Sequence, residues 1–351
     1  MPEFREITDR DIWEQFTPLQ ENGLFLQSYD HKTLNEEMGQ RTWLFEISEN
    51  DKSIRSLVTK IEAKRGTFLY LPYGPMFAST SSQDLFIPFF NKLQEIAQQE
   101  GASFIRVSPF LEESTEHLQC FTDTGFRRAP LHMLAETLWV KDLSKKTEDE
   151  LLQEMEKKHR NLVRRALKDG VKVRKTTDCS TVETFWSLYE QTFKRHKFTP
   201  YPKKLIQSQL SLFSKHDSAL MLEAIYEEKV LGSALVMYYG NAGAYHHGAS
   251  SSDPTFRKIP ATYLLQWEAI KEAQRRGAAF YNFWGVAPYD LDAEGKRVYK
   301  HKNHPFNGIT HFKTGFGGRR LDLVPCQDLV ISWKYWFTYM IESFRKWKRG
   351  F

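Results

Sequence analysis

The sequence predicts a mixed α/β protein built from two tandem copies of one domain. The stretch "YLPYGPMFAS" (70–79) aligns through its glycine with "AYHHGASSSD" (244–253), at an offset of 248 − 74 = 174 residues. The stretch "QEGASFIRVSP" (99–109) aligns in the same way with "RRGAAFYNFWG" (275–285), at an offset of 277 − 101 = 176 residues. Because the two offsets nearly agree, an internal duplication is the best explanation.

The order of elements within each half supports the duplication. Three short alternating runs, typical of strands, precede one run with helical spacing that stops at a glycine, and a further strand follows. The strand runs are 41–48, 53–63 and 67–73 in the first half and 219–227, 230–239 and 242–250 in the second; the helical runs are 84–99 and 261–276. This order is that of the GNAT-like (acyl-CoA N-acyltransferase) fold. We therefore expect two tandem GNAT-like domains, α/β (α+β) in class, with no coiled-coil arm.

The segment joining the halves, 145–175, carries a concentration of positive charge. Acidic residues at 148–150 are expected to open one helix, basic residues follow them, and Gly170 marks the end, an order that suits the helix dipole. The basic residues are Lys157, Lys158, Arg160, Arg164, Arg165 and Lys168. Two interpretations stay open: a solvated linker helix, or a basic surface for a phosphate-rich substrate.

Composition favours a protein of a reducing compartment. The chain has 351 residues, a formal net charge of +5 and a pI of about 8.8. Cys120, Cys179 and Cys326 form no CxxC pattern, which argues against a disulfide framework or a thiolate zinc site. The sequence shows no signal-peptide pattern and no uncharged apolar run of about 18 residues. We therefore expect a cytoplasmic location.

Cofactor and metal patterns are missing. The stretches that would open an acyl-CoA pyrophosphate loop, "STSSQDLFIP" and "FRKIPATYLL", lack clustered glycines, and Pro260 removes a backbone donor. The run "DLDAEG" resembles the opening of an EF-hand loop, but His301 occupies the position of the bidentate glutamate. His246 and His247 are neighbours on a predicted strand and are expected to face opposite ways. We expect no cofactor and no metal, with acyl-CoA kept as an alternative.

The segment "GITHFKTGFGGRR" (308–320) places Lys313 beside a glycine-rich turn. Glycine runs often cradle phosphate, whereas an isolated lysine among apolar and glycine neighbours is often chemically active. Both possibilities stay open on these residues alone.

A family resemblance extends over nearly the whole chain. "LFLQSYDH", "YLPYGPMF", "HRNLVRRALKDGV", "FYNFWGVAP" and "HPFNGITHFKTGFGG" come in the order seen in the Fem (FemABX) aminoacyltransferases, which build peptidoglycan cross-bridges. The most specific part is 281–318. The resemblance implies a transfer of an amino acid from aminoacyl-tRNA to an amine of a peptidoglycan precursor stem peptide. It also implies that the Lys313 ammonium stabilises the developing oxyanion and that the adjacent glycines let the chain pass close to the substrate.

The resemblance also implies further site residues. Substrate-binding side chains carried over are Arg195, for the precursor's phosphates, Tyr245 and Tyr73. The chain departs from the family pattern at Asn35, Ser108 and Thr199, where other members carry a lysine, an acidic residue and a tyrosine. These three positions are included in the expected acceptor site, and their identity leaves a nucleotide-linked (UDP) or a lipid-linked muramyl peptide open as the acceptor. Lys158, Arg160 and Arg164 are the expected contacts to tRNA or another phosphate.

The C-terminal segment 328–351 has a broad apolar face and ends in "RKWKRG". It is expected to close onto the first domain, with peripheral contact to the inner face of the plasma membrane as the alternative. The expected domains are 1–145 plus 317–351 on the acceptor side, and 146–316 with the catalytic lysine. An acyl-CoA-dependent N-acyltransferase and a non-catalytic protein that binds cell-wall precursors are the rival functions.

Overall fold

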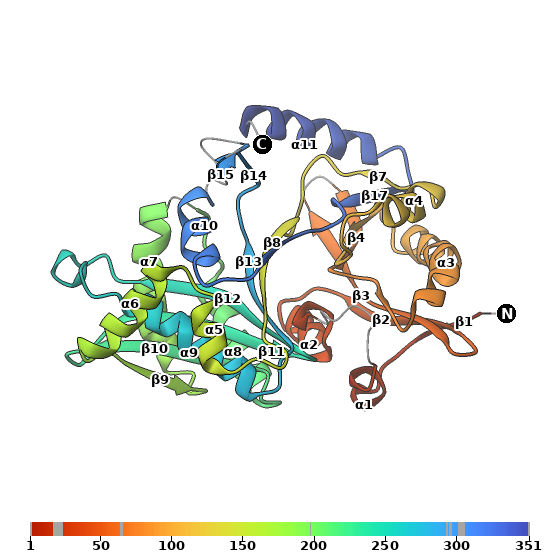
Figure 1. Ribbon diagram of the computed structural model, residues 1–351. Coiled ribbons are helices and arrows are strands. Elements are labelled where there is room, and N and C mark those ends of the chain that lie inside the picture. The colour runs from red at the N-terminus through yellow and green to blue at the C-terminus, as the bar shows by residue number, and fades with distance from the viewer. Residues whose placement is uncertain are drawn as a thin grey trace. The chain divides into compact units, whose positions relative to one another are not determined.

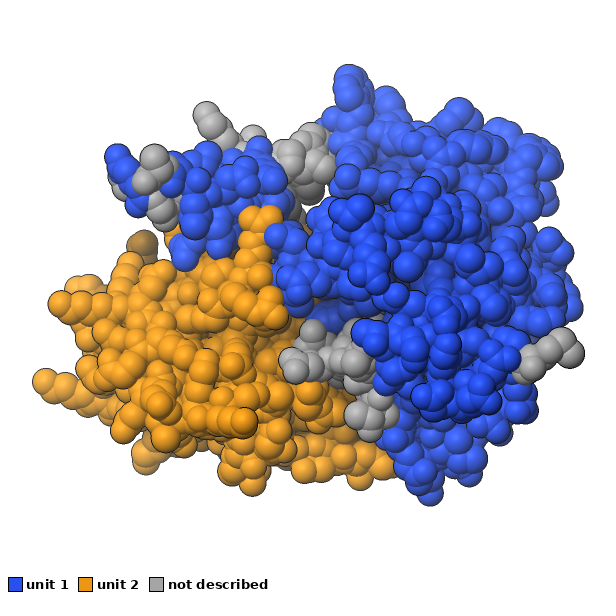
Figure 2. All heavy atoms as spheres, turned by 45° about the vertical axis from the view of Figure 1, so that its right-hand side comes forward, with its two compact units in different colours: residues 1–137, 288–304, 321–351 blue, residues 138–287, 305–320 orange. Residues whose placement is uncertain are grey.

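The computed structural model describes residues 2–16, 24–63, 66–196, 198–292, 294, 297–300 and 306–349. The chain divides into two compact units, which Figure 2 colours separately. Unit 1 comprises residues 1–137, 288–304 and 321–351, and unit 2 comprises residues 138–287 and 305–320. His301, His304 and Pro305, which entered the metal and motif arguments, lie outside the described residues.

Unit 1 is built on a mostly antiparallel sheet with the strand order β1-β2-β3-β4-β6-β17-β7, and β5 pairs with β3 (Figure 1). Its strands are β1 (Glu3–Glu6), β2 (Thr42–Glu49), β3 (Lys52–Ala63), β4 (Gly66–Pro72), β5 (Met76–Phe77), β6 (Phe104–Ser108), β7 (Arg127–Arg128) and β17 (Gln327–Val330), with the separate pair β14 (Tyr289–Leu291) and β15 (Arg297–Tyr299). Its helices are α1 (Arg10–Glu14), α2 (Tyr29–Glu37), α3 (Phe86–Gln99), α4 (Thr115–Asp123) and α11 (Tyr335–Arg349), with short 3₁₀ turns at Phe25–Gln27 and Thr80–Leu85. The apolar face of α3, including Phe86, Phe89 and Phe90, forms much of the core.

Unit 2 is built on a sheet with the strand order β16-β8-β13-β12-β11-β10-β9. Its strands are β8 (Thr137–Asp142), β9 (Lys172–Thr176), β10 (Ala219–Tyr226), β11 (Lys229–Tyr239), β12 (Ala242–Ser250), β13 (Phe280–Gly285) and β16 (Arg319–Asp322). Its helices are α5 (Glu148–Gln153), α6 (Lys157–Lys168), α7 (Thr181–His196), α8 (Lys203–Ser214), α9 (Ala261–Arg275) and α10 (Asn307–Thr314), with a 3₁₀ turn at Pro254–Phe256. Its longest described helix, α7, has 16 residues, so no coiled-coil arm interrupts the described part of this unit.

The same motif occurs in both units. In unit 1, β2, β3 and β4 form an antiparallel meander, α3 follows, and β6 pairs in parallel with β4. In unit 2, β10, β11 and β12 form the meander, α9 follows, and β13 pairs in parallel with β12. A helical crossover between parallel neighbours after a meander is the expected tandem arrangement, so the prediction of a duplicated α/β fold is confirmed.

The observed division differs from the expected boundaries in two places. Strand β8 joins the sheet of unit 2, so the first change of unit falls at 137/138 rather than at 145/146. Residues 288–304, which contain β14 and β15, group with unit 1 rather than with the second domain. The return to unit 1 falls at 320/321, four residues after the expected position.

The joining segment forms two helices and not the one expected. Helix α5 has a capping box at Thr147 and Glu150, and α6 begins after Glu156. The break follows from a contact distant in sequence: the Glu156 backbone is extended (ψ 140°), and its amide donates to the Gly315 carbonyl at 2.9 Å. Charge pattern alone could not have shown this contact.

Among the described residues, no helix is long and apolar enough to cross a membrane.

Candidate active site

The candidate site is built at the ends of strands β12 and β13, whose parallel pairing is short. Only Ala242–Ala244 pair with Phe280–Asn282, after which both strands become irregular. The register of β13 against β8 shifts between Asn282 and Gly285, and Trp284 between them has a left-handed backbone (φ 70°), which is strained for a bulky residue. The Asn282 side-chain oxygen accepts a hydrogen bond from the Trp284 amide at 2.8 Å and so stabilises this turn. Both residues lie in the most specific part of the resemblance, 281–318, but the irregular backbone was not predicted, since neither residue signals it by type.

A β-bulge in β12 overturns the expectation that His246 and His247 face opposite ways. The register against β11 shifts so that Leu235 pairs with His247 and Val236 with Tyr245, which leaves His246 as the extra residue. Both imidazoles then reach the same amide: Gln209 Nε2 lies 2.9 Å from His246 Nε2, and Gln209 Oε1 lies 3.0 Å from His247 Nε2. Burial lowers the pKa of His247 to about 3, so this ring is neutral at physiological pH.

Tyr245 lies at the start of the same bulge. Burial raises the pKa of its phenol to about 12, so the hydroxyl stays protonated and can donate a hydrogen bond. A Cβ placed on Gly248 would lie 1.7 Å from the Tyr245 hydroxyl oxygen, so only glycine leaves room for this ring. Gly248 is therefore needed for the Tyr245 ring to occupy its position.

Lys313 lies in the last turn of the short helix α10 and not in a hairpin or on an open turn. Only 6% of the residue is exposed, and its ammonium donates to the Gly285 carbonyl at the end of β13 over 2.6 Å. Among the described residues no carboxylate lies within ion-pair distance of it; the ring of Phe306 lies 5.9 Å away. Burial lowers the pKa of Lys313 to about 7, so protonated and neutral forms coexist at physiological pH.

Unit 2 contains a second buried lysine with a different environment. Lys141 on β8 is fully buried, but its ammonium forms a 2.6 Å ion pair with Glu154. Such a pair compensates the buried charge, which suits a structural role. The contrast marks Lys313, whose hydrogen-bond acceptor is a neutral carbonyl, as the reactive candidate.

The glycines after Lys313 approach the protein's own chain closely. A Cβ on Gly315 would lie 1.9 Å from the His159 ring, and a Cβ on Gly318 would lie 2.3 Å from the Val140 carbonyl oxygen. Gly317 and Gly318 also have positive φ angles of 78° and 107°. The described contacts of these glycines are thus to their own unit, whereas the sequence suggested close passage to a substrate.

Helix α6 is fixed to the candidate catalytic helix through His159. Its Nε2 lies 3.1 Å from the Phe312 carbonyl oxygen, and its ring packs edge-on against Phe316 at 5.0 Å. The three expected phosphate contacts lie on this helix: Lys158 and Arg164 are exposed, and Arg160, which is partly buried, donates to the Gln153 carbonyl. The basic surface and Lys313 therefore belong to directly connected elements of unit 2.

Arg195 forms a second cationic position at the end of α7. Its guanidinium donates to the hydroxyls of Ser250 (2.8 Å), the last residue of β12, and of Ser252, and no carboxylate among the described residues pairs with it. Partial burial lowers the pKa of Arg195 below its ordinary value, although a guanidinium stays charged at neutral pH. An arginine with adjacent hydroxyls and no counter-charge suits an anionic ligand. Thr199 is exposed in the loop between α7 and α8.

The remaining expected site residues lie in unit 1 and are buried. Tyr73, which has a positive φ of 53°, donates through its hydroxyl to the Ala135 carbonyl at 2.8 Å. The Asn35 side-chain amide donates to Thr59 Oγ1 at 3.0 Å, and Ser108 accepts a 3.1 Å hydrogen bond from the Tyr70 hydroxyl. All three side chains therefore have hydrogen-bond partners within their own unit.

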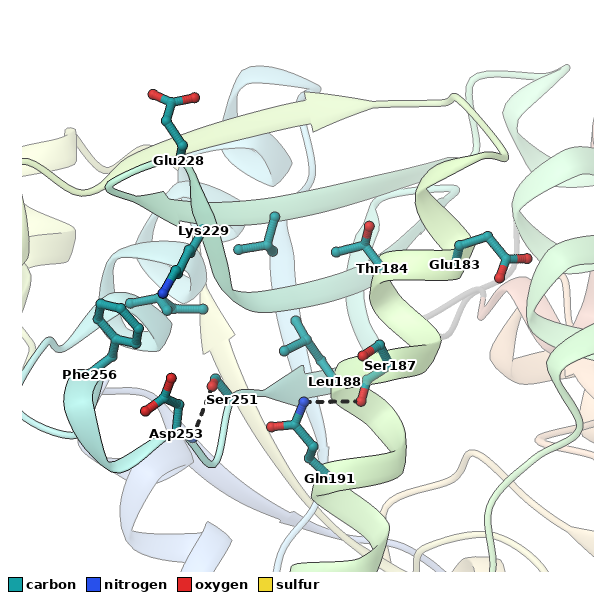
Figure 3. A pocket seen from close by; sticks show the side chains of 12 residues that line it. Glu183, Thr184, Ser187, Leu188, Gln191, Glu228, Lys229, Ser251, Asp253 and Phe256 are labelled. Carbon is teal, nitrogen blue, oxygen red and sulfur yellow. Dashed lines mark hydrogen bonds between the residues drawn. The ribbon is translucent and has the colours of Figure 1, made fainter.

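A separate hollow of about 650 Å³ opens on unit 2 (Figure 3). It lies beside α7 and the start of β11, and none of the expected site residues lines it. Its charged side chains are Glu183, Glu228, Asp253 and Lys229, and Lys229 lies 4.8 Å from the ring of Phe256. This mainly acidic lining does not suit a phosphate-bearing substrate.

No group of three or more potential metal-ligating side chains occurs among the described residues. Helix α9, which follows β12, begins at Ala261, and its N-cap residue, Pro260, makes no side-chain hydrogen bond to the first turn.

These features define a tandem GNAT-fold protein with a buried lysine beside the parallel strand pair of its second unit. A FemAB family model matches residues 8–126, and a GNAT acetyltransferase domain model matches residues 153–301. The FemA aminoacyltransferase of Staphylococcus aureus is 22% identical over 92% of each chain. The crystal structure of FemX superimposes with a TM-score of 0.80 at 19% identity, over 97% of this chain and 100% of that one. A tandem GNAT protein from the clavulanic acid pathway has a TM-score of 0.53 at 9% identity.

The chain is similar to the proteins of the Fem family. The family model matches the first unit, and the FemA and FemX similarities extend over both.

Proposed function

We propose that this protein is an aminoacyltransferase that moves an amino acid from aminoacyl-tRNA to an amine of a peptidoglycan precursor stem peptide. The observation that carries the proposal is the buried Lys313 ammonium, which is bonded to the Gly285 carbonyl and has no carboxylate partner among the described residues. The similarity to the aminoacyltransferase FemA supports the reaction class.

In the proposed reaction the acceptor amine attacks the carbonyl carbon of the aminoacyl ester. A C–N bond forms, the ester C–O bond breaks, and the tRNA 3′ hydroxyl leaves with a proton while the amine loses one. Negative charge develops on the carbonyl oxygen, and the Lys313 ammonium stabilises it in a site of low dielectric. The ester is already activated, so the reaction needs no cofactor.

Charge complementarity supports the proposed substrates. Lys158, Arg160 and Arg164 would contact the tRNA backbone from α6, whose His159 packs against the end of α10. Arg195, bonded to two serine hydroxyls, would bind the acceptor's phosphates. Tyr245 and Thr199 complete the proposed substrate contacts of unit 2. Such precursors place the reaction on the cytoplasmic side of the membrane.

The test is a transfer assay with purified protein, a pool of labelled aminoacyl-tRNAs, and UDP-linked or lipid-linked muramyl pentapeptide in separate reactions. We expect label on one precursor, and about 10²- to 10³-fold slower transfer by Lys313→Met, as for the loss of one oxyanion-stabilising donor. Lys92→Met, which removes an exposed lysine from α3, is the matched control and should transfer at the wild-type rate.

Two outcomes contradict the proposal. Acetyl transfer from acetyl-CoA without transfer from any aminoacyl-tRNA would favour the acyl-CoA enzyme. Tight precursor binding that Lys313→Met leaves intact, without turnover by either protein, would favour a non-catalytic binding protein.

A further inference from the structure

Helix α11 is attached to unit 1 through its more polar face. Tyr335 is fully buried, packs 5.2 Å from Phe104 and donates a 3.1 Å hydrogen bond to Asp328. One turn or two further along, Thr338 is buried and Glu342 forms a 2.8 Å ion pair with the buried Arg106. Although burial alone would lower the pKa of Arg106, its bonds to Asp328 and Glu342 raise it, so this anchor is charged. The orientation of α11 on unit 1 is therefore fixed by specific contacts.

The opposite face of α11 carries large apolar side chains that are exposed. They are Trp336 (44%), Phe337 (53%), Met340 (57%), Ile341 (38%), Phe344 (60%) and Trp347 (77%), and Trp333 (67%) precedes the helix. At 100° per residue the six helical positions cover roughly 140° of the circumference, centred opposite Tyr335. We call these seven residues the outer face. The helix closes onto the first domain as expected, but through Tyr335, Thr338 and Glu342, so that its large apolar side chains face outward.

Exposed basic residues flank the outer face. On the same helical projection, Lys334 and Arg345 fall just beyond one edge of the apolar arc and Lys348 falls just inside that edge, and all three are exposed. A contiguous apolar surface beside a row of cations, with tryptophans at both ends, matches the chemistry of the boundary between lipid headgroups and acyl chains.

We propose that the outer face of α11 docks on an anionic phospholipid surface, with the axis of the helix parallel to the membrane plane. The apolar side chains enter the headgroup region, and Lys334, Arg345 and Lys348 pair with lipid phosphates. The inference deepens the proposed function and rests on it in one respect: a lipid-linked acceptor is presented at this same surface.

Vesicle flotation tests the docking without any substrate. The wild-type chain is expected to float with vesicles of phosphatidylglycerol mixed with phosphatidylcholine, and to bind phosphatidylcholine alone more weakly. Phe344→Gln/Trp347→Gln should lower the partition coefficient by at least about tenfold. The matched control, Ile87→Gln/Leu167→Gln, removes two similarly exposed apolar side chains from α3 and α6 and should bind as the wild type does.

A second pair of changes separates charge from apolar area. Arg345→Gln/Lys348→Gln should lower binding to the anionic vesicles by about tenfold or more, and leave binding to phosphatidylcholine alone unchanged. Equal loss on both vesicles would contradict the assignment of phosphate contacts to these cations. Circular dichroism melting confirms that each variant is folded.

Three outcomes overturn the inference. In the first, the wild-type chain fails to float with anionic vesicles. In the second, the control variant loses as much binding as Phe344→Gln/Trp347→Gln does. In the third, the wild-type chain binds no vesicles, and sedimentation shows a dimer that Phe344→Gln/Trp347→Gln dissociates, which would assign the face to a second copy. Transfer to the UDP-linked acceptor should be unchanged in Phe344→Gln/Trp347→Gln. A chain that floats but transfers nothing therefore refutes the proposed function alone, and one that transfers but does not float refutes the docking alone.

Discussion

At the scale of single residues, Lys313 links the chemistry of the site to the stability of the protein. Its pKa is about 7 in the folded chain, because burial disfavours the charged form, whereas a free lysine has a pKa of about 10.4. Between these values the unfolded chain binds more protons than the folded one, so stability rises with pH, by at most about 1.4 kcal/mol per unit. Below pH 7 the full cost of burying the charge is present.

Lys313→Met removes this cost. The unfolding free energy of Lys313→Met should therefore exceed that of the wild type by the largest amount below pH 7, and this difference should shrink toward pH 10. Urea denaturation of both proteins at about pH 6.5, 8 and 9.5 measures the difference. A difference that does not change with pH would show that Lys313 titrates normally.

Gly315 and His159 make a second prediction at this scale. Gly315→Ala should destabilise the protein by about 1–3 kcal/mol, because the added Cβ would lie 1.9 Å from the imidazole. In a His159→Ala background the same change should cost less than about 1 kcal/mol, since the obstructing ring is gone. Thermal unfolding of the four proteins of this cycle gives the coupling energy, and additive effects would contradict the packing described here.

At the scale of elements, the basic surface of α6 is expected to act on the donor and not on the chemical step. Lys158→Gln/Arg164→Gln should raise KM for aminoacyl-tRNA several-fold with kcat nearly unchanged, and reduce the salt dependence of binding by about one to two units of log–log slope. Lys203→Gln/Lys204→Gln, on α8 of the same unit, is the charge-matched control. A loss of kcat at unchanged KM would assign α6 a role in positioning Lys313 through His159 instead.

Sequence patterns predicted elements well where the signal is local. The alternating run at 242–250 coincides with β12, and the helical run at 261–276 nearly coincides with α9, since periodicity and a terminal glycine are local properties. The bulge at His246 was missed because it depends on the pairing of β12 with β11. The break before α6 was missed for the same kind of reason, as its partner, Gly315, is 159 residues further along the chain.

At the scale of the whole molecule, duplication explains how much could be predicted. The two copies of one motif repeat the same glycine-containing stretches and the same order of elements, and this repetition distinguishes a weak sequence pattern from chance. The orientation of α11 could not be predicted in this way, because Arg106 and Asp328, which anchor it, belong to other elements of unit 1. The sequence singled out Lys313, whose catalytic role stays a prediction, but the burial of that lysine arises only when α10 packs within unit 2.

The most direct test of the account is the pH dependence of the transfer rate, measured as kcat/KM and divided by the fraction of acceptor amine that is unprotonated. If the Lys313 ammonium stabilises the oxyanion, this corrected rate is highest at low pH and falls about tenfold per pH unit above a pKa near 7, while Lys313→Met is slow and independent of pH. A corrected rate that rises through pH 7 would make Lys313 a general base, and equal rates for the two proteins would remove it from catalysis.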